Sequence, residues 1–513
     1  MQLRPYQHDA VESIVQRGNL LLAMTMGSGK TATAIASVRK LRQQRRASHG
    51  IVFALKSTKW QWVREIERWD PRARVQVIDG DKAQRIRGYK HAWRYHYTIL
   101  HYQCLIHDWD LIIKYLPLDF IIADEVTAFK GFATKTSRRG KQLAKRTDIR
   151  MGLSGQPVEN RPEELFSIME FVDPDVLGGF HKFDRCFIVR DRWGKPLRYR
   201  NLYLLQERMG EAMFRRSRED IAEWLPERIE IEVPVPLEPA VMALHDLVRK
   251  DLSLAIDQAI AGGAHGSFDV LAHYGRVAQG ETISLMGQVM SRLLAMRMLS
   301  SHPRLLRLSA DEFDTEVSRR GSEYASLLKA NGLLNNLPPS TAKLDALVEL
   351  VTQILDEDPT HKVVVFSYFK PMLAMIAQLM PAKHVMITGD VTGRMRDQAI
   401  VQFNNDPTVR VFLSSDAGAY GVDLNQGSHL ICYDLPWSAG ALQQRVSRID
   451  RTNSAFPTIN IMYMYGQDTI EERMYQMLLQ KAKVARAFLD GEFDAKGILK
   501  LDLQSLRDFL DAA

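Results

Sequence analysis

One stretch near the N-terminus has the composition of a loop that binds phosphate. It follows an apolar run at 19–24 and precedes a helical pattern at 32–41, and it comprises Gly27, Ser28, Gly29, Lys30 and Thr31. Between a strand and a helix, such a loop surrounds phosphate oxygens with backbone N–H groups and the helix N-terminus. Lys30 would reach the β and γ phosphates of ATP, and Thr31 would coordinate Mg²⁺. The first glycine usual in such loops is replaced by Met24.

A second apolar run, at 120–123, ends in the two carboxylates Asp124 and Glu125. Asp124 would hold Mg²⁺ through water, and Glu125 would orient and deprotonate the attacking water. Alone, such a pair is more typical of solvated charges, but the phosphate loop in the same chain favours catalysis. Upstream, the amide of Gln7 can both donate to and accept from the edge of an adenine.

Two arginines more than four hundred residues later complete the candidate ATP site. Arg448 and Arg451 lie three apart, so an interpretation as a helix places them on one face. They would stabilise negative charge on the γ-phosphate in the transition state. A solvated basic face is the alternative. A nucleotide bound by one segment and sensed by the other indicates two lobes that close on ATP.

The elements that must position these residues alternate between strand and helix patterns up to about residue 172. The apolar runs have strand length and lie at 19–24, 51–55, 98–102, 120–123 and 151–154. Buried runs separated by helices predict a parallel α/β sheet, whose ligands bind at the carboxyl ends of the strands.

Helical periodicity then dominates from 173 to 335, as in 240–260 and 284–299, with one strand-like run at 229–235. Residues 261–267 are predicted to form a mobile loop. A second α/β block follows, with helices at 342–355 and 371–380. Its predicted strands lie at 363–366, 384–387, 411–414, 429–433 and 459–464.

The composition is that of a globular protein with a mild basic excess. The chain has 513 residues, 46% apolar and 25% charged, with a net charge of +7. This length predicts several domains, and the charge is compatible with a polyanionic partner. Three widely spaced cysteines make a zinc site or a disulfide framework improbable. The polar start and the lack of a run of ~18 apolar residues predict an intracellular protein.

Taken in order, these segments resemble superfamily 2 helicase-like motors, and most closely the SWI/SNF-type family of double-stranded DNA translocases. The similar segments lie at 3–7, 27–31, 60–65 with Trp62, 124–127, 153–160, 214–218 with 225–226, Arg297 with 302–303, 366–367, 414–424, 444–451 and 469–472. In this family, 214–218 would be a helix carrying paired arginines.

The resemblance implies an α/β fold of two RecA-like parallel-sheet lobes with helical protrusions. The predicted domains are lobe 1 at 1–172, protrusions and inter-lobe link at 173–335, lobe 2 at 336–482 and a helical tail at 483–513. It also implies ATP and Mg²⁺ as cofactors and DNA, bound without sequence preference, as partner, with no membrane. So lean a chain resembles a bacterial or phage-like member, cytoplasmic and associated with the nucleoid.

The same resemblance suggests residues that grip the DNA backbone from loops at the strand ends. Short hydroxyls, a lysine and backbone amides suit sugar and phosphate and carry no base code. For each of these residues, a purely structural role in its loop is the alternative to DNA contact. The candidates are Lys56, Ser57, Thr58, Ser154, Gly155, Gln156, Ser367, Ser415 and Asp416. Basic residues at 138–141 and 215–218 could extend the track, although a solvated surface is slightly favoured for the first group.

The chain departs from the family pattern at four positions: Thr127, Gln156, Asp423 and Asp450. We expect Thr127 and Gln156 to form a polar link that couples hydrolysis to movement. Three functions remain open: a translocase on duplex DNA, a helicase that remodels forks or separates strands, and a nucleic-acid-binding scaffold without hydrolysis. The family-wide match favours the first, and the complete catalytic set argues against the third.

Overall fold

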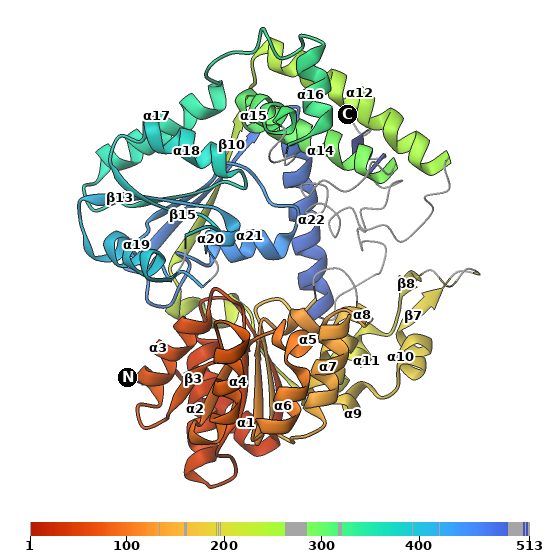
Figure 1. The fold of residues 1–513 in the computed structure, drawn as a ribbon, viewed down its shortest axis with the longest axis vertical. Coiled ribbons are helices and arrows are strands. Elements are labelled where there is room, and N and C mark those ends of the chain that lie inside the picture. Colours follow the sequence, from red (N-terminus) through yellow and green to blue (C-terminus); the bar gives the residue numbers. More distant parts are fainter. Residues whose placement is uncertain are drawn as a thin grey trace. The chain divides into compact units, whose positions relative to one another are not determined.

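The computed structural model divides the chain into two compact units. It describes residues 2–490 except 133, 159–161, 191, 193, 195, 262–284, 316–320, 392 and 420, and also 506, 507, 509 and 510. The first unit contains residues 1–225, to which Asp450–Asn453 and residues 483–498 also belong. The second contains 226–449 and 454–482 with the end of the chain. Figure 1 colours the first unit mostly red to yellow and the second green to blue.

The first unit is built on a seven-stranded parallel sheet in the order β3-β4-β2-β5-β6-β1-β9. Its central strands β1, β2 and β5 are buried except for the first residue of β1 and the last of β5, which explains their continuous apolar sequences. The strands are β1 (Asn19–Met24), β2 (Gly50–Ala54), β3 (Val75–Val77), β4 (Tyr97–His101), β5 (Phe120–Asp124), β6 (Arg150–Ser154) and β9 (Met213–Arg216).

Both faces of this sheet are covered. Along β1, Leu21 belongs to one apolar cluster, whereas Leu20 and Leu22 belong to another. This alternation is the two-residue period of a strand with helices on either side. The helices are α1 (Pro5–Arg17), α2 (Lys30–Gln43), α3 (Lys59–Trp69), α4 (Lys82–Lys90), α5 (Cys104–His107), α6 (Trp109–Tyr115), α7 (Lys135–Ala144), α8 (Pro162–Val172), α9 (Pro174–Leu177), α10 (Phe180–Phe187) and α11 (Leu202–Met209).

Smaller elements complete the first unit. Three short 3₁₀ turns are η1 (Ala92–Arg94), η2 (Val126–Phe129) and η3 (Glu219–Trp224). A separate antiparallel pair, β7 (Ile188–Arg190) and β8 (Pro196–Tyr199), follows α10.

The second unit is built on a six-stranded parallel sheet in the order β10-β15-β14-β11-β13-β12. Along β11, Val364 and Phe366 belong to one apolar cluster and Val363 and Val365 to another, so this sheet is also covered on both faces. The strands are β10 (Glu227–Val235), β11 (Val363–Phe366), β12 (Lys383–Ile387), β13 (Val409–Ser414), β14 (His429–Cys432) and β15 (Thr458–Gly466).

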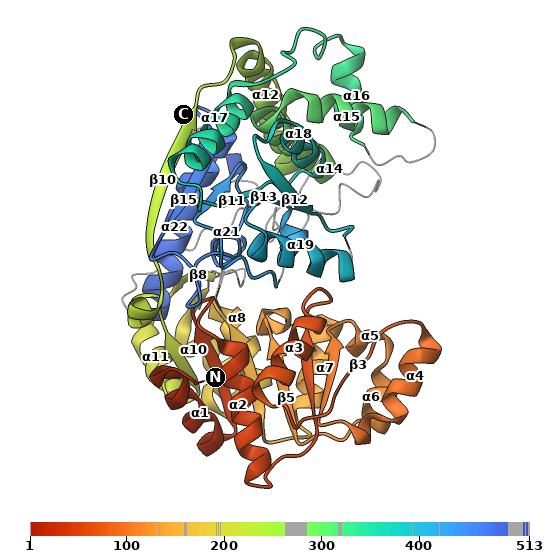
Figure 2. The same ribbon diagram turned by 90° about the vertical axis from the view of Figure 1, so that its left-hand side faces the viewer.

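Four helices of the second unit, α12 and α14 to α16, pack together as a separate group (Figures 1 and 2). The described helices are α12 (Pro239–Ala261), α14 (Leu285–Ser301), α15 (Pro303–Asp314), α16 (Glu323–Ala330), α17 (Ala342–Glu357), α18 (Lys370–Leu379), α19 (Gly393–Asn405), α20 (Asp416–Ala419), α21 (Ala439–Val446) and α22 (Ile470–Asp490).

The predicted fold class, α/β with two parallel-sheet lobes, is confirmed. One local prediction is corrected: the segment at 214–218 is not a helix, because β9 pairs with β1 along Met213–Arg216. Strands β3, β7 and β8 were not predicted. The strand-like run at 229–235 is confirmed as a strand, since it lies in β10, which pairs with β15 in the second sheet.

The loop predicted at 261–267, apart from its first residue, lies outside the described residues, and so does most of the predicted tail beyond 490. In the part of the chain that is described, no helix has the length and apolarity to cross a membrane.

Candidate nucleotide and nucleic-acid sites

The strand order of the first sheet brings the candidate ATP-binding residues to one edge. Strands β5, β6 and β1 are neighbours and run parallel, so their carboxyl ends meet at the same edge. The phosphate loop follows β1, Glu125 follows β5, and Gly155 follows β6 between them. Parallel sheets bind ligands at this edge.

Glycine is required at two positions of the phosphate loop. Gly27 and Gly29 have φ angles of 78° and 81°, a left-handed region that side chains disfavour. A Cβ at Gly27 would lie 2.5 Å from the carbonyl oxygen of Asp450, a residue that belongs to the first unit. A Cβ at Gly29 would collide with the amide nitrogen of Gln7. Both substitutions would therefore deform the loop.

Gln7, the predicted adenine-binding residue, is bonded to the phosphate loop in this structure, and its contact with adenine stays a prediction. Its Nε2 donates to the carbonyl oxygen of Ser28 at 2.9 Å, and its Oε1 accepts from the backbone N–H of Arg4 at 2.8 Å. The hydroxyl of Tyr6 donates to the same Ser28 carbonyl at 2.8 Å. Gln7 is buried, so it supports the loop from α1.

The loop and the start of α2 fit a chain of phosphates. Lys30 begins α2, and its ammonium donates to the carbonyl oxygens of Met24 and Thr25 at 2.9 and 3.1 Å. The first N–H groups of a helix lack partners within the helix and attract anions. Ser28 is fully buried, and its Oγ has no hydrogen-bond partner among the described residues. This orphaned donor beside a lysine and a helix N-terminus suits phosphate oxygens.

Asp124 lies at the end of β5 with one carboxylate oxygen, Oδ2, accepting from the indole N–H of Trp62 at 2.9 Å. Burial raises the pKa of Asp124, while the Trp62 bond and the charge of Lys30 partly oppose this shift. Trp62 is itself buried on α3. A bound Mg²⁺ would favour the ionised carboxylate. With substrate phosphates and water, one carboxylate and the Thr31 hydroxyl are sufficient donors for Mg²⁺.

Glu125 adopts a left-handed backbone conformation, with φ 52° and ψ 60°. Such a conformation in a residue other than glycine is strained and is frequent at functional sites. Neighbouring packing holds it: the hydroxyl of Tyr102 donates to the carbonyl oxygen of Asp124 at 2.5 Å. The backbone therefore turns sharply between the two carboxylates.

The two arginines predicted to share a helix face do not lie on a helix. Helix α21 ends at Val446, and both arginines follow it in a turn and a bend. Arg448 belongs to the second unit, is nearly buried, and donates to the carbonyl oxygens of Gln444 and Val422 at 2.7 and 3.3 Å. Arg451 belongs to the first unit, and its Cα would lie 3.3 Å from a Cβ at Gly27. Turn geometry, rather than helical spacing, positions them.

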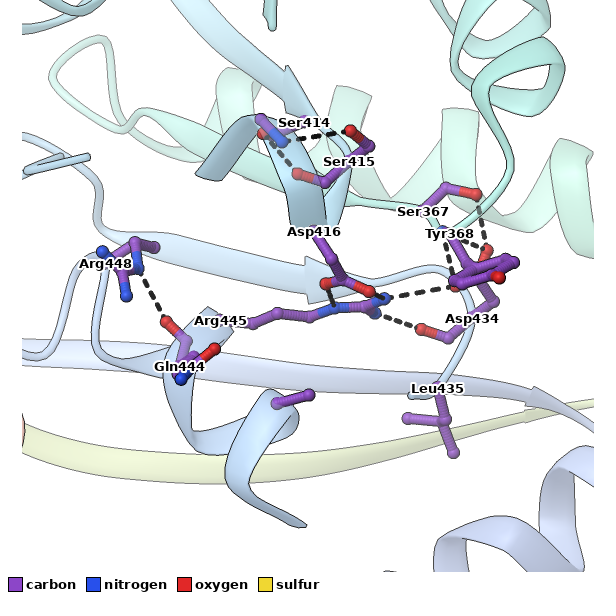
Figure 3. Close-up of polar contacts among 12 residues, drawn as sticks. Ser367, Tyr368, Ser414, Ser415, Asp416, Asp434, Leu435, Gln444, Arg445 and Arg448 are labelled. Atoms are coloured by element: carbon purple, nitrogen blue, oxygen red, sulfur yellow. Dashed lines mark hydrogen bonds and ion pairs between the residues drawn. The ribbon is translucent and has the colours of Figure 1, made fainter. Parts of the chain in front are cut away.

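The second sheet carries a buried charge network at the carboxyl ends of its strands (Figure 3). Arg445, fully buried on α21, donates to both carboxylate oxygens of Asp416 at 2.5 and 2.8 Å. It also lies 3.5 Å from a carboxylate oxygen of Asp434. Burial alone would lower the pKa of Arg445, but Asp416 and Asp434 raise it above its ordinary value.

Asp434 links this network to the loop after β11. Its carboxylate accepts from the Ser367 hydroxyl at 2.5 Å and from the Tyr368 N–H at 2.8 Å. Arg445 and Asp434 are not among the candidate residues predicted from the sequence. The only available signal was an arginine inside the similar segment at 444–451, preceded in the chain by an acid just after a strand.

The predicted DNA contacts differ in how accessible they are. Lys56 and Ser57 are exposed after β2. Gly155 and Gln156 are half-buried, and a Cβ at Gly155 would lie 2.6 Å from Cγ of Met26. The remaining hydroxyls are buried. Those of Thr58, Ser154 and Ser415 are bonded within their own loops, and that of Ser367 donates to Asp434. Their contact with DNA remains a prediction, and the Asp416 carboxylate already pairs with Arg445.

The predicted link between Thr127 and Gln156 is absent, since these two described side chains share no hydrogen bond. The backbone N–H of Gln156 donates instead to Oγ of Ser154 at 3.1 Å.

Parts of the predicted basic track are committed to internal contacts. Arg139 donates to the carbonyl oxygens of Leu105 and Ile106, both at 2.8 Å. Lys141 pairs with Glu170 at 2.7 Å. Arg218 pairs with Asp450 at 3.0 Å within the first unit. Asp450, one of the departures from the family pattern, thus has a structural partner.

Comparison with known proteins identifies the family. The SNF2-related domain matches residues 6–282, and the helicase conserved C-terminal domain matches residues 342–453. The chain therefore belongs to the SNF2-related family.

The individual relatives have low sequence identity to this chain, but the matches cover nearly all of it. The chain is 26% identical to human DNA repair and recombination protein RAD54B, over 95% of this chain and 55% of that protein. It is 23% identical to mouse DNA annealing helicase and endonuclease ZRANB3, over 96% of this chain and 41% of that protein. The chain thus spans about half the length of these curated relatives.

A solved structure, the Sulfolobus solfataricus SWI2/SNF2 ATPase core in complex with dsDNA, is 23% identical. The match covers 96% of this chain and 94% of that chain, with a TM-score of 0.42.

Proposed function

We propose that this chain is a motor that moves along duplex DNA by hydrolysing ATP with Mg²⁺. The observation that carries the proposal is the edge of the first sheet, where the phosphate loop, Asp124 and Glu125 follow neighbouring parallel strands. Membership of the SNF2-related family supports the same reaction. Relatives named for DNA repair, recombination and annealing support DNA as the partner.

The residues divide the chemistry among them. Lys30 and the start of α2 would hold the β and γ phosphates, while Thr31 and Asp124 would hold Mg²⁺, which supplies charge stabilisation. Glu125 would orient the attacking water and accept its proton. Arg448 and Arg451 would offset charge on the γ-phosphate. The strained, left-handed backbone at Glu125 would let its side chain point in a different direction from that of Asp124.

ATP hydrolysis should be measured with no nucleic acid, single strands, duplex and forked DNA. We expect Mg²⁺-dependent hydrolysis that duplex DNA stimulates most. The Lys30→Ala variant is the control for contaminating activity. Equal rates with and without nucleic acid would remove the motor proposal.

Movement can be separated from strand separation by two displacement assays. A translocase should displace a third strand wound on a duplex without releasing the strands of the duplex itself. Release of a strand from a fork, without displacement on the intact duplex, would favour the fork-remodelling or strand-separating alternative.

A further inference from the structure

A run of basic residues on α10 and the β7–β8 pair has no part in the site described above. Residues 180–200 contain seven lysines and arginines against two aspartates. Figure 1 shows β7 and β8 as a separate pair beside α10. We refer to the exposed side chains Lys182, Arg185, Arg198 and Arg200 as the basic ribbon.

The alternation of side chains along a strand places the two arginines of β8 and its end on the exposed face. Ile188 pairs with Tyr199 across the two strands, and both side chains are buried. Arg198 and Arg200 flank Tyr199 in sequence, so they point to the opposite face. Strands β7 and β8 pair only with each other, which leaves a narrow two-stranded ribbon.

The base of the ribbon is anchored, so its charges are held in place. The Tyr199 hydroxyl donates to Glu163 at 2.9 Å. Arg190 pairs with Asp184 at 2.5 Å, and this hydrogen bond raises the pKa of Arg190. Arg200 donates to the carbonyl oxygen of Arg185 at 2.5 Å.

The described aspartate of this segment is already paired. Asp184 forms an ion pair with Arg190, which is not part of the basic ribbon. Within the residues that the structure describes, none of the four ribbon side chains pairs with a carboxylate. Tyr203, three residues beyond Arg200 in the chain, is also 67% exposed. The result is an exposed, positively charged surface.

We propose that the basic ribbon is a further contact with the phosphate backbone of duplex DNA, separate from the loops at the strand ends. This inference rests on the proposed function. Guanidinium groups bind phosphates through two parallel hydrogen bonds, and a two-stranded ribbon has the width of a DNA groove. Contacts of this kind carry no base code, as a motor requires.

The test compares two triple variants that lose the same charge. The ribbon variant is Lys182→Gln, Arg185→Gln, Arg198→Gln, which keeps Arg200 because that residue supports the chain. The control variant neutralises three exposed residues of α4, beside β3: Lys82→Gln, Arg87→Gln and Lys90→Gln. Duplex affinity is measured by fluorescence anisotropy over a range of salt concentrations.

The ribbon variant should bind duplex DNA about 10-fold more weakly or worse at about 100 mM salt, and its log–log salt slope should be less steep by about 2–3. The control should keep nearly the wild-type slope. Melting temperature and hydrolysis without DNA should match the wild type in both. Charge reversal at Arg198 (Arg198→Glu) should weaken binding further.

Equal slopes in the two triple variants would overturn the inference, because only net charge would then matter. Unchanged affinity in the ribbon variant would also overturn it and would point to an acidic protein partner. Stimulation of the wild-type enzyme by duplex DNA tests the proposed function independently, so the two ideas can fail separately.

Discussion

The two sheets place charged groups at equivalent edges but treat them differently. At the first sheet, Asp124 is buried against Trp62 with a raised pKa, and Lys30 lies on backbone carbonyls. At the second sheet, Arg445 is matched by Asp416 and Asp434. We propose that the charged groups of the first sheet bind a ligand. Those of the second sheet pair with one another and hold the neighbouring loops together. Substitutions should therefore affect chemistry in the first unit and stability in the second.

The largest expected effect on chemistry is at Glu125. Glu125→Gln keeps the side-chain shape but removes the base, so the rate of hydrolysis should fall by about 10²–10⁴-fold. Binding of ATP and the melting temperature should change little. Single-turnover hydrolysis and equilibrium nucleotide binding would measure the two separately. A variant with most of its activity would show that another group activates the water.

The largest expected effect on stability is at Arg445. Arg445→Met leaves Asp434 buried without its cation, and breaking a buried pair costs about 3–5 kcal/mol. Denaturant unfolding followed in the second unit would measure this loss. The control is Arg410→Met, an arginine that contacts only backbone carbonyls among the bonds of the described residues. Equal losses of unfolding free energy in the two variants would mean that the ion pairs of Arg445 do not make it more important for stability than Arg410.

A smaller effect is expected at Gln7. Gln7→Ala removes one hydrogen bond to the Ser28 carbonyl, while Tyr6 still donates to it. The loss of a neutral bond is worth about 0.5–1.5 kcal/mol, so apparent ATP affinity should fall by several-fold and not more. A loss of more than about 100-fold would indicate that Gln7 contacts the nucleotide directly, since 1.4 kcal/mol corresponds to a factor of about ten.

The smallest effect has the opposite sign. Asp124→Asn retains an acceptor for the Trp62 N–H and removes a charge that burial disfavours, so it should raise the melting temperature slightly when nucleotide is absent. The pKa of Asp124 is higher in the folded state than in the unfolded state. Its contribution to the stability of the folded state is therefore fully present below the pKa of the unfolded state, and it is lost as the pH rises through the pKa of the folded state. The gain in the variant should therefore appear at higher pH and vanish on acidification. A lower melting temperature at neutral pH would contradict this account.

The sequence by itself determined the elements whose signals are local. Strand β1, the phosphate loop and α2 follow one another within 25 residues, and a strand, a glycine loop and a helix can be recognised there without distant contacts. The same holds for the apolar runs of both sheets, because a strand buried on two faces must be apolar throughout. Family motifs then supplied the order of the two lobes.

Only the tertiary structure decided features that depend on partners far away in the chain. Met213–Arg216 is a strand because β1 offers it an edge nearly two hundred residues upstream, and the motif alone suggested a helix. Helix α21 ends before Arg448, and Arg445 pairs with Asp416 and Asp434, which follow the ends of β13 and β14. Spacing of residues along a chain reports the period of one element. Which other element packs against it is decided by the tertiary structure, through the burial of apolar surface and the pairing of buried charges.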